Sequence, residues 1–429
     1  MKEIKVGIIG FGTVGAGVAD CLLKNNDVIE KRTGVKLTLA KIADLDITSD
    51  RGVVIPEGVL TTDAAELIKE VDIVIELVGG TTIAKKFILD ALEIGKPIVT
   101  ANKALLAEHG EELFNAAEKS IADIYYEASV AGGIPVVKAL REGLSGNRIE
   151  KIYGIMNGTC NYIFTRMENE GIDFAPVLDD AQKLGYAEAE PSLDVDGFDT
   201  AHKTAILAAL AYGEWFGMDP IYVEGIREIT VEDINFADEM GYRIKLLAII
   251  KQENDNIQAR VHPTLIPKSS LLGNINDVFN GVMIKGDIVD DTLYYGRGAG
   301  RDATASAVVA DIVDVALNLQ HDCVHRVPAF RVGKQYKNFI TMDEVESRYY
   351  LRLQVEDKAG VIAKLTTILG DKNISISSFV QNDNQEANNV SVVILTHLSL
   401  EKDVKDAIEK IEALSEVNDK VKLIRIEDI

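Results

Sequence analysis

The sequence predicts an α/β protein with three units: a doubly wound parallel sheet first, a second α/β unit in the middle, and a small βαββαβ unit at the C-terminus. Three observations lead to this prediction. A strand-like run enters a glycine motif and then a helix. Strand and helix patterns alternate up to about residue 145. Residues 347–429 follow the order strand, helix, strand, strand, helix, strand.

Composition limits the class of protein. A chain of 429 residues with 47% apolar residues is long enough for two or three packed domains. The net charge of −23 argues against nucleic acid and anionic membranes as partners. Three widely spaced cysteines favour a reducing compartment, and neither a signal peptide nor a membrane-spanning run is recognisable, so a cytoplasmic protein is expected.

The first unit begins with a strand at Ile4–Ile9, which runs into a GxGxxG motif and then a helix up to about Lys24. In this order Gly10 allows a tight turn, Gly12 lets a pyrophosphate approach the backbone, and Gly15 lets the helix pack on the sheet. The pattern is typical of a dinucleotide-binding Rossmann domain; the alternative is a glycine-rich turn that binds nothing.

The same alternation continues through residues 1–145. Further strands are expected at Val35–Ala43, Val71–Val78, Pro97–Thr100 and Ile121–Tyr126. Helices are expected at Ala64–Lys69, Ile83–Glu93 and Ala104–Lys119. Strands separated by helices in this way form a parallel, doubly wound sheet.

Asp44 closes the second strand, where a carboxylate would accept hydrogen bonds from the adenosine ribose. Its distance from the glycine motif exceeds the usual ~20 residues, because Asn25 to Gly34 is inserted. A carboxylate repels a 2′-phosphate, which favours NAD over NADP. Lys41 and Arg51 are nearby and could reverse that preference.

Two later loops of the first unit carry candidate ligands. Lys103 follows the strand end Thr100, where ligands of open α/β sheets bind, although a plain surface lysine is an equal alternative. The loop Glu127–Pro135 could surround a hard cation such as Na⁺ or Mg²⁺ with backbone carbonyls and the Glu127 carboxylate. The alternative is a tight loop before a helix at Pro135–Gly143.

In the middle unit, residues 146–325, the pattern of strand-like runs predicts a second sheet, which is mixed or open. Strands are expected at Ile149–Met156, Ile226–Thr230, Ile244–Ile250, Ile257–Val261 and Gly281–Ile288, and a helix at Asn161–Asn169. A glycine-rich turn at Tyr294–Arg301 opens a helix at Asp302–Leu319. That helix could return to the first unit and bring Gly298 and Gly300 near a cofactor; a simple helix start is the alternative.

The stretch from Ala181 to Lys203 concentrates ionisable groups. Its carboxylates and bases are Glu188, Glu190, Asp194, Asp196, Asp199, His202 and Lys203. Glycines and a proline predict a loop over Tyr186–Gly197, followed by a helix on which Asp199 and Lys203 share a face. The alternative is a solvated acidic loop that ends in an ordinary i,i+4 ion pair.

These residues together resemble homoserine dehydrogenase from Val6 to about Leu317. The strongest motif is an Ala, Gly-Tyr-Ala, a Pro and then Asp194-x-Asp196-Gly197-x-Asp199-x-x-x-Lys203. Four more motifs stand in the family's order: Thr100–Lys103, the EASV-GG-IP loop, Asn157–Tyr162 and Gly296–Val308. Cys160 stands where the family often has Thr, and the second strand end lacks an arginine that some members use for a 2′-phosphate.

The resemblance implies reversible NAD(P)-dependent reduction of L-aspartate 4-semialdehyde to L-homoserine, in the biosynthesis of threonine, methionine and isoleucine. It implies that Lys203 is the acid/base, that Lys103 assists at the substrate oxygen beside the nicotinamide, and that the substrate is bound by Glu188, Asp194 and Asp199. Implied cofactor contacts are Gly10, Phe11, Gly12, Thr13, Val14, Gly15, Asp44, Lys103, Gly185 and Gly300. An implied Na⁺ site consists of Glu127 with the carbonyls of Val130, Gly132 and Ile134.

The lysines suit this chemistry. A free lysine has a pKa near 10.4, so its ammonium can donate a proton to the oxygen of the aldehyde as hydride arrives. A second ammonium nearby would depress one pKa and stabilise the developing charge. Two other readings remain open. One is a semialdehyde dehydrogenase that works through Cys160, with His202 as base, and the other is a non-catalytic ligand sensor.

Residues 326–346 have no strong periodicity and are predicted to form a linker. Residues 347–429 resemble an ACT domain. Such a domain implies regulation by an amino acid, here L-threonine, held between paired domains near Gly360 and Ile374. The alternative is a purely structural dimerisation module. A homodimer or homotetramer is expected.

Overall fold

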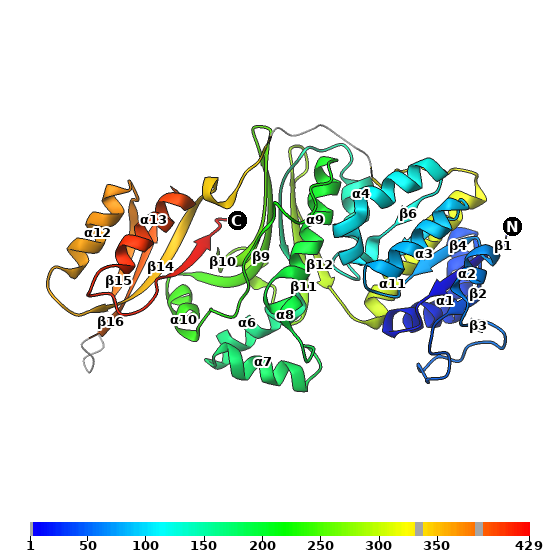
Figure 1. The fold of residues 1–429 in the computed structure, drawn as a ribbon, viewed down its shortest axis with the longest axis horizontal. Helices are drawn as coiled ribbons and strands as arrows, with labels where there is room; N and C mark the ends of the chain where they lie inside the picture. Colours follow the sequence, from blue (N-terminus) through cyan, green and yellow to red (C-terminus); the bar gives the residue numbers. More distant parts are fainter. Residues whose placement is uncertain (1–2, 331–337, 382–388) are drawn as a thin grey trace.

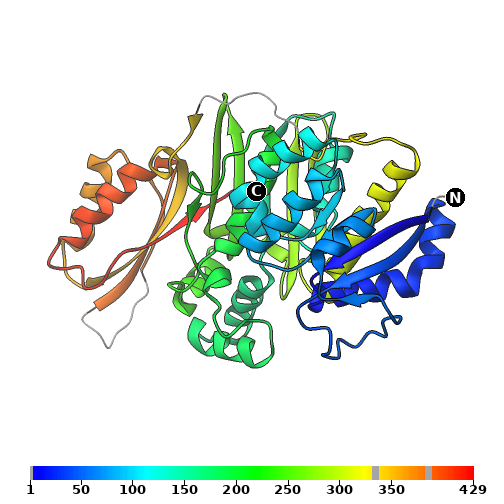
Figure 2. The same cartoon turned by 45° about the vertical axis from the view of Figure 1, so that its right-hand side comes forward.

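The computed structural model describes residues 3–330, 338–381 and 389–429. Three bodies follow one another along the long axis of the molecule (Figure 1): the N-terminal sheet with its helices, a central long sheet, and the C-terminal unit. The same succession is seen after a 45° turn (Figure 2). The predicted fold class is confirmed.

The N-terminal body is a six-stranded parallel sheet of order β3-β2-β1-β4-β5-β6. Its strands are β1 (Glu3–Ile9), β2 (Lys36–Ala43), β3 (Leu60–Thr61), β4 (Ile73–Glu76), β5 (Ile98–Thr100) and β6 (Ile124–Tyr125). Its helices are α1 (Thr13–Thr33), α2 (Ala64–Glu70), α3 (Thr82–Glu93) and α4 (Lys103–Ser120). The strand order reverses between β1 and β4, and open α/β sheets bind ligands at such a point.

A helix from much later in the chain completes this body. α11 (Arg301–Gln320) packs against α1, where a Cβ on Gly17 would lie 2.8 Å from the Arg301 side chain. Val308 and Ile312 of α11 share a buried cluster with Ile8 of β1. The sheet is therefore covered by a helix that the chain supplies only after the central body is complete.

The central body contributes most strands of a 12-stranded sheet whose main path runs β12-β11-β7-β9-β10-β18-β14-β16-β15. Its strands are β7 (Ile149–Ile155), β8 (Tyr222–Val223), β9 (Tyr242–Glu253), β10 (Asn256–Pro267), β11 (Phe279–Gly286) and β12 (Asp290–Arg297), with β13 (Asn338–Phe339) beside β10. Its helices are α6 (Gly158–Glu170), α7 (Phe174–Lys183), α8 (Ser192–Val195), α9 (Phe198–Tyr212) and α10 (Val231–Glu239). Between the two bodies lie α5 (Val136–Lys138) and the π-helical turn Ala139–Gly143.

The C-terminal unit has the predicted order β14 (Glu346–Glu356), α12 (Val361–Asp371), β15 (Ile376–Gln381), β16 (Asn389–Thr396), α13 (Glu401–Glu412) and β18 (Lys422–Ile426), with a short β17 (Ser399–Leu400). Along β14 the residues alternate, and Leu351 and Leu353 enter the core under the two helices. β18 pairs in parallel with β10, at Thr264↔Arg425 and Leu265↔Ile426. The C-terminal unit is thus joined edge to edge with the central sheet.

The structure corrects several sequence predictions in the central body. Ile226–Thr230 is not a strand. Ile226 and Ile229 lie in a turn with their side chains buried, and the short strand β8 comes earlier in the chain. The run has apolar residues only at Ile226 and Ile229, and the Ile226 N–H bonds to the Val195 carbonyl instead of a neighbouring strand. The loop Tyr186–Gly197 contains the one-turn helix α8. Of the predicted turn Tyr294–Arg301, the first four residues belong to β12.

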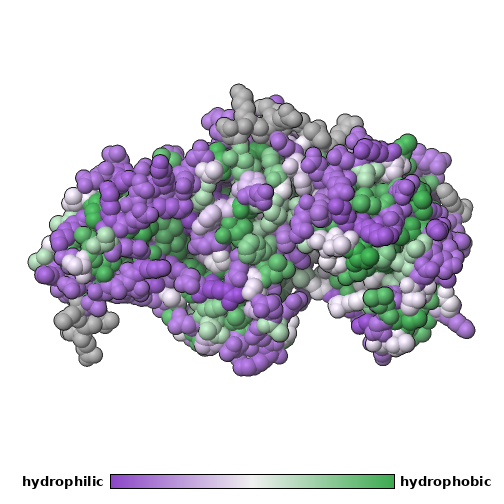
Figure 3. Space-filling model, in the orientation of Figure 1, coloured by the Kyte–Doolittle hydropathy of each residue, from purple (hydrophilic) through white to green (hydrophobic). Residues whose placement is uncertain are grey.

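In the first unit the insertion Asn25–Gly34 is mostly helical, since α1 continues to Thr33 and Gly34 ends it in the left-handed conformation, with φ +72°. The strand predicted at Ile121–Tyr126 is only two residues long because Ile121 caps α4. Hydrophilic residues cover much of the face shown in Figure 3, with hydrophobic residues visible between them. Within the described ranges, no helix is both long enough and apolar enough to cross a membrane.

Candidate active site

The acidic loop ends where α9 begins, and this junction places the candidate catalytic groups. Gly197 precedes α9 with φ +89°, a conformation that favours glycine, and its missing Cβ would lie 3.1 Å from Val223. The turn directs Asp199 and Lys203 inward on one face of α9, where they are only 5% and 8% exposed. Buried charges require partners.

Lys203 has two such partners. Its Nζ lies 2.6 Å from Asp199 Oδ2 and donates a hydrogen bond to the Met156 carbonyl, also at 2.6 Å. Met156 follows directly after β7, so the end of a central strand and the first turn of α9 together hold the ammonium. The third hydrogen of this ammonium has no partner among the described residues.

Lys103 reaches the same carboxylate from the N-terminal body. It is the first residue of α4, and its Nζ lies 3.1 Å from Asp199 Oδ1. Asn102 caps α4 by accepting from the Leu105 N–H, and its amide donates to the Gly80 carbonyl, which fixes the helix start. One buried carboxylate therefore holds two ammonium groups that come from different domains.

Asn157 completes the cluster. Its side-chain amide donates to Asp194 Oδ1 at 2.7 Å and to Asp199 Oδ2 at 2.9 Å, while its carbonyl oxygen caps α6 through the Cys160 N–H. The Asn157 turn is one of the motifs in the sequence, but the sequence alone does not predict a role for Asn157 in the site. An Asn directly before a helix signals a cap, and only the fold shows the second function of its amide.

The remaining predicted substrate and loop residues lie on the outer side of this cluster. Asp194 is half-buried, whereas Glu188 and Gly185 are exposed on the loop after α7. Glu188 is close enough to raise the pKa of Lys103, though less than Asp199 and Asp194 do. Asp196 points elsewhere and pairs with Arg227.

The glycine turn after β1 has the form that a nucleotide pyrophosphate requires. Gly10 has φ +101°, and any Cβ there would lie 2.5 Å from the Leu77 carbonyl. Gly12 is exposed at the start of α1, with no atom within 4 Å of a Cβ position and no side-chain cap on the helix. Thr13 is exposed and Val14 half-buried at the first helical positions. The open helix start thus leaves N–H groups for an anion.

Asp44 lies beside this turn. Its carboxylate accepts from the Phe11 N–H at 2.5 Å and from the Asp46 N–H at 2.9 Å. Gly15 allows α1 to approach the strand, because a Cβ there would lie 2.0 Å from the Gly10 carbonyl. The residues present therefore fit a dinucleotide at the point where the sheet order reverses.

Comparison with known proteins agrees with this geometry. The family model "Homoserine dehydrogenase" matches residues 135–313, the model of that family's NAD-binding domain matches residues 10–127, and the ACT domain model matches residues 349–416. A homoserine dehydrogenase of Neisseria gonorrhoeae is 46% identical over 100% of both chains.

The chain belongs to the homoserine dehydrogenase family. Among solved structures, the homoserine dehydrogenase from Thiobacillus denitrificans superposes with a TM-score of 0.94 at 46% identity and covers 100% of this chain and 99% of that one. A hyperthermophilic archaeal homoserine dehydrogenase in complex with NADPH has a TM-score of 0.63 at 27% identity and covers 74% of this chain and 98% of that one. The protein is therefore an oxidoreductase with an NAD(P)-binding domain and a C-terminal ACT domain.

The charged groups of this candidate site act strongly on one another. Burial alone would raise the pKa of Asp199, but Lys203 and Lys103 outweigh it and hold that pKa well below its usual range. Asp199 in turn raises the pKa of Lys103, in spite of partial burial. Burial, together with the nearby Asp199 charge, raises the pKa of Asp194. The site therefore holds its two positive charges around one negative group.

The sequence alternatives of a cysteine enzyme and of a non-catalytic sensor receive no support from the homoserine dehydrogenase comparisons. Burial raises the pKa of the Cys160 thiol well above its ordinary value, which disfavours the reactive thiolate. Its Sγ is 3.3 Å from the Asp194 carbonyl, and no hydrogen bond joins it to His202 in the described part of the chain. Burial also lowers the pKa of His202.

The predicted cation loop packs against the turn before α11. A Cβ on Gly132, which has φ +51°, would lie 2.4 Å from the Gly298 carbonyl, and Gly300 directly precedes α11 with φ +112°. Glu127 is 4% exposed and accepts from the N–H groups of Val137 and Lys138. Burial raises its pKa to about 7. The described residues contain no cluster of three or more His, Cys, Asp or Glu side chains suited to a metal.

Proposed function

We propose that the protein interconverts L-homoserine and L-aspartate 4-semialdehyde, with Lys203 as the acid/base. The observation that carries this proposal is the ammonium of Lys203, which Asp199 and the Met156 carbonyl fix at 2.6 Å each. The nicotinamide of a bound dinucleotide supplies or accepts the hydride. In the reducing direction the Lys203 ammonium gives its proton to the aldehyde oxygen. In the oxidising direction the neutral Lys203 amine takes the proton from the homoserine hydroxyl.

Lys103 has a supporting role in this proposal. Its ammonium stands on the other oxygen of Asp199, at the edge of the nucleotide domain, so it adds positive charge where the substrate oxygen becomes negative. Asp199 is buried between the two lysines, which favours a role in positioning them over direct contact with the substrate. Asp194 and the exposed Glu188 are then the carboxylates that remain for the substrate ammonium.

The coenzyme preference is proposed to be NAD over NADP. Asp44 places a carboxylate beside the glycine turn, where it would meet the ribose and repel a 2′-phosphate. Arg51, one of the two candidate partners for a 2′-phosphate, is held by Asp46 at 3.1 Å. The archaeal relative in complex with NADPH shows that this family also includes NADPH binders, so the assignment depends on this chain's own residues.

The Glu127 loop is proposed to hold Na⁺. The donors are oxygens only, which suits a hard ion. The carbonyls of Val130 and Gly132 accept no hydrogen bond from the described residues, although both residues are buried. Glu127 lies beside Asp311, which accepts a hydrogen bond from the Glu127 N–H at 2.8 Å, and burial raises the pKa of both carboxyl groups. A bound cation would favour their ionised forms. Ile134 would be the third carbonyl, although it also accepts from the Val136 N–H.

The ACT domain is proposed to bind an amino-acid effector, L-threonine, near Gly360 and Ile374. The strands at the two ends of the long sheet, β12 and β15, each have one neighbour among the described strands and could pair with a second copy in a homodimer or homotetramer. Three free cysteines fit a cytoplasmic location. We propose units at 1–145, 146–325 and 347–429, with the linker 326–346, part of which lies outside the described residues.

Turnover with the Lys203→Met variant tests the proposal. Homoserine oxidation and semialdehyde reduction are followed with both NAD(H) and NADP(H). We expect kcat to fall by roughly 10²-fold or more in Lys203→Met, with unchanged coenzyme binding. Lys183→Met is the matched control, because Lys183 lies in the same segment but is exposed and, among the described residues, pairs only with Asp180. Activity of Lys203→Met within a few-fold of the wild type would remove Lys203 from the mechanism.

A further inference from the structure

The ACT domain holds both ends of one segment of the catalytic domain, Tyr222–Asp233, which we term the linking segment. At its first end Arg425 of β18 donates to Glu224 Oε2 at 2.6 Å and to the Tyr222 hydroxyl at 3.3 Å. Arg425 is 2% exposed, and Glu401 of α13 holds the rest of its guanidinium. This end is therefore fixed by a buried, charge-assisted contact.

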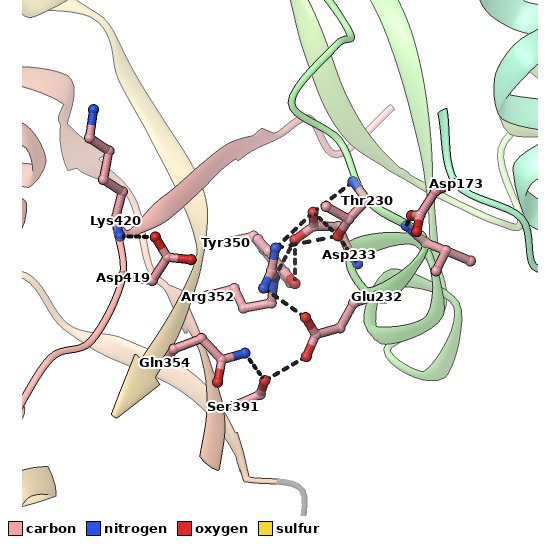
Figure 4. A network of polar contacts seen from close by, with 11 residues as sticks. Asp173, Thr230, Glu232, Asp233, Tyr350, Arg352, Gln354, Ser391, Asp419 and Lys420 are labelled. Atoms are coloured by element: carbon pink, nitrogen blue, oxygen red, sulfur yellow. Dashed lines mark hydrogen bonds and ion pairs between the residues drawn. The ribbon is translucent and has the colours of Figure 1, made fainter. Parts of the chain in front are cut away.

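At the second end Arg352 of β14 binds two carboxylates at the start of α10 (Figure 4). Its Nε donates to Asp233 Oδ1 at 2.7 Å, and its Nη1 donates to Glu232 Oε2 at 2.7 Å. Tyr350 also donates to Asp233, at 3.1 Å. Asp233 is fully buried and at the same time caps α10 through Thr230. The planar fork of arginine suits such a two-carboxylate contact.

The pattern of β14 explains why this face is polar. Side chains along a strand alternate, so Arg348, Tyr350, Arg352 and Gln354 share one face, while Leu351 and Leu353 enter the ACT core from the other. Ser391 of β16 adds to the polar face by donating to Glu232. The polar face points at α10 (Figure 4), not at solvent.

The middle of the linking segment packs against the loop Tyr186–Gly197, which we term the catalytic loop. The Ile226 N–H bonds to the Val195 carbonyl at 2.8 Å, and Arg227 pairs with Asp196 and donates to Ser192. Gly225 approaches so closely that a Cβ would lie 2.5 Å from the Val195 carbonyl. Val195 and Asp196 stand between Asp194 and Asp199 in the chain. A shift of the linking segment therefore moves the carboxylates around Lys203.

We propose that Arg352 and Arg425 are positioning residues for the reaction: they act through the linking segment on the catalytic loop Tyr186–Gly197, which carries Asp194 and leads into Asp199 at the start of α9. The proposal rests on the proposed site, because it assigns that loop to the reaction centre. Neither arginine contacts the lysines. The same path gives the ACT domain, with or without an effector, a mechanical connection to the substrate end of the site.

A double-mutant cycle between Arg352 and Arg227 tests the connection. Arg227 is a suitable partner because it is exposed, so its loss leaves the fold intact. We expect Arg352→Ala and Arg227→Ala each to lower kcat/KM for homoserine by about 3- to 30-fold, with KM for the coenzyme within about twofold of the wild type. In the double variant the losses should not multiply, since both break one path.

Two arginines serve as matched controls. Arg348→Ala removes an arginine from the same face of β14 that bonds to Tyr242 and Asp428, not to the linking segment. Arg148→Ala removes an exposed ion pair with Asp287 that matches Arg227. Both should keep wild-type kinetics. Wild-type kcat/KM in Arg227→Ala, or losses that multiply in the double variant, would overturn the proposal.

The cycle remains decisive in two difficult cases. If Arg352→Ala does not fold, Arg227→Ala combined with Arg425→Lys takes its place, because the lysine keeps the charge but cannot bridge Glu224 and Glu401 together. If Lys203→Met retains activity, the proposed acid is wrong, while the coupling between positions 352 and 227 is still measured independently. The two failures are therefore distinguishable.

Discussion

The Lys103 ammonium lies 3.1 Å from Asp199 Oδ1, and this ion pair joins the nucleotide domain to the catalytic domain. The second oxygen of the same carboxylate holds Lys203 at 2.6 Å. Because Asp199 is buried, its charge is weakly screened and acts on both lysines at once. The position of the proposed acid therefore depends on how the nucleotide-binding body and the central body meet.

Replacing Asp199 should disturb both rate and pH dependence. In Asp199→Asn we expect kcat/KM to fall by about 10²-fold, because both ammonium groups lose their anchor. Asp199 raises the pKa of Lys103 and burial opposes it. Without the carboxylate the Lys103 pKa falls, so the alkaline loss of activity should begin at lower pH than in the wild type. The pH profile of kcat/KM measures this shift, with Glu190→Gln as an exposed control; an unchanged alkaline limb would contradict it.

The periodicity of one helix was enough to predict that Asp199 and Lys203 share a face. It could not supply Asn157 or the Met156 carbonyl, because β7 brings these from more than forty residues earlier in the chain. Lys103 was predicted at a strand end, yet its pairing with Asp199 depends on how two domains meet. Local patterns therefore identify the chemical groups, and tertiary packing decides which of them meet.

The same distinction applies to the fold. The doubly wound sheet and the βαββαβ order follow from regular alternation and were predicted correctly. Within the linking segment, the sequence predicts a strand at Ile226–Thr230, because apolar residues recur there. In the structure the Ile226 N–H and the Arg227 side chain bond to the catalytic loop Tyr186–Gly197. The carboxylates of the segment, Glu224, Glu232 and Asp233, pair with arginines of the ACT domain. Contacts of this kind have no periodic signature.

Removal of the Cys160 thiol should leave the reaction intact. Cys160 is fully buried in α6, and burial raises its thiol pKa well above the ordinary value, so a nucleophilic thiolate is disfavoured. We expect Cys160→Ala to keep kcat within about threefold of the wild type and to lose some stability, about 1 kcal/mol for the small cavity. Steady-state kinetics and thermal melting check this, with Cys21→Ala as control. Abolished turnover in a folded variant would restore the cysteine mechanism.

Sodium should stabilise the protein above neutral pH through Glu127. Burial raises the folded pKa of Glu127 from 4.5 to about 7, so the folded state binds more protons than the unfolded state between these values. Stability from this group is therefore present below about pH 4.5 and is lost as pH rises through about 7, at a cost of about 3 kcal/mol. A cation favours the ionised form and should recover part of that loss.

We therefore expect Tm at about pH 8 to rise by about 2 °C or more in NaCl relative to choline chloride of equal ionic strength. In Glu127→Gln the sodium effect should disappear, and the fall in stability with rising pH should flatten. Equal melting temperatures of the wild type in both salts would show that the loop holds no sodium.

Asp44 should set the coenzyme preference. We expect the wild type to have a kcat/KM for NADH at least about threefold above that for NADPH, because the carboxylate beside the glycine turn repels a 2′-phosphate. Asp44→Asn keeps an oxygen for the Phe11 N–H and removes the charge, so the ratio should fall mainly by improved use of NADPH. Asp27→Asn on the exposed side of α1 is the control. A wild type that prefers NADPH would show that the carboxylate does not decide selection.

Gly360 should be needed for the threonine response and dispensable for the reaction. It starts α12 with φ +94°, and no atom lies within 4 Å of its missing Cβ, so a side chain there would be strained and would enter the space proposed for the effector. In Gly360→Ala we expect the threonine concentration for half-inhibition to rise at least about tenfold, with basal kcat within about twofold. Gly370→Ala is the matched control, since Gly370 lies inside α12 with open space and an ordinary helical backbone. Initial rates over a threonine series measure both variants. A wild type insensitive to threonine would remove it as the effector, and an equal response in Gly360→Ala would move the site elsewhere in the ACT domain.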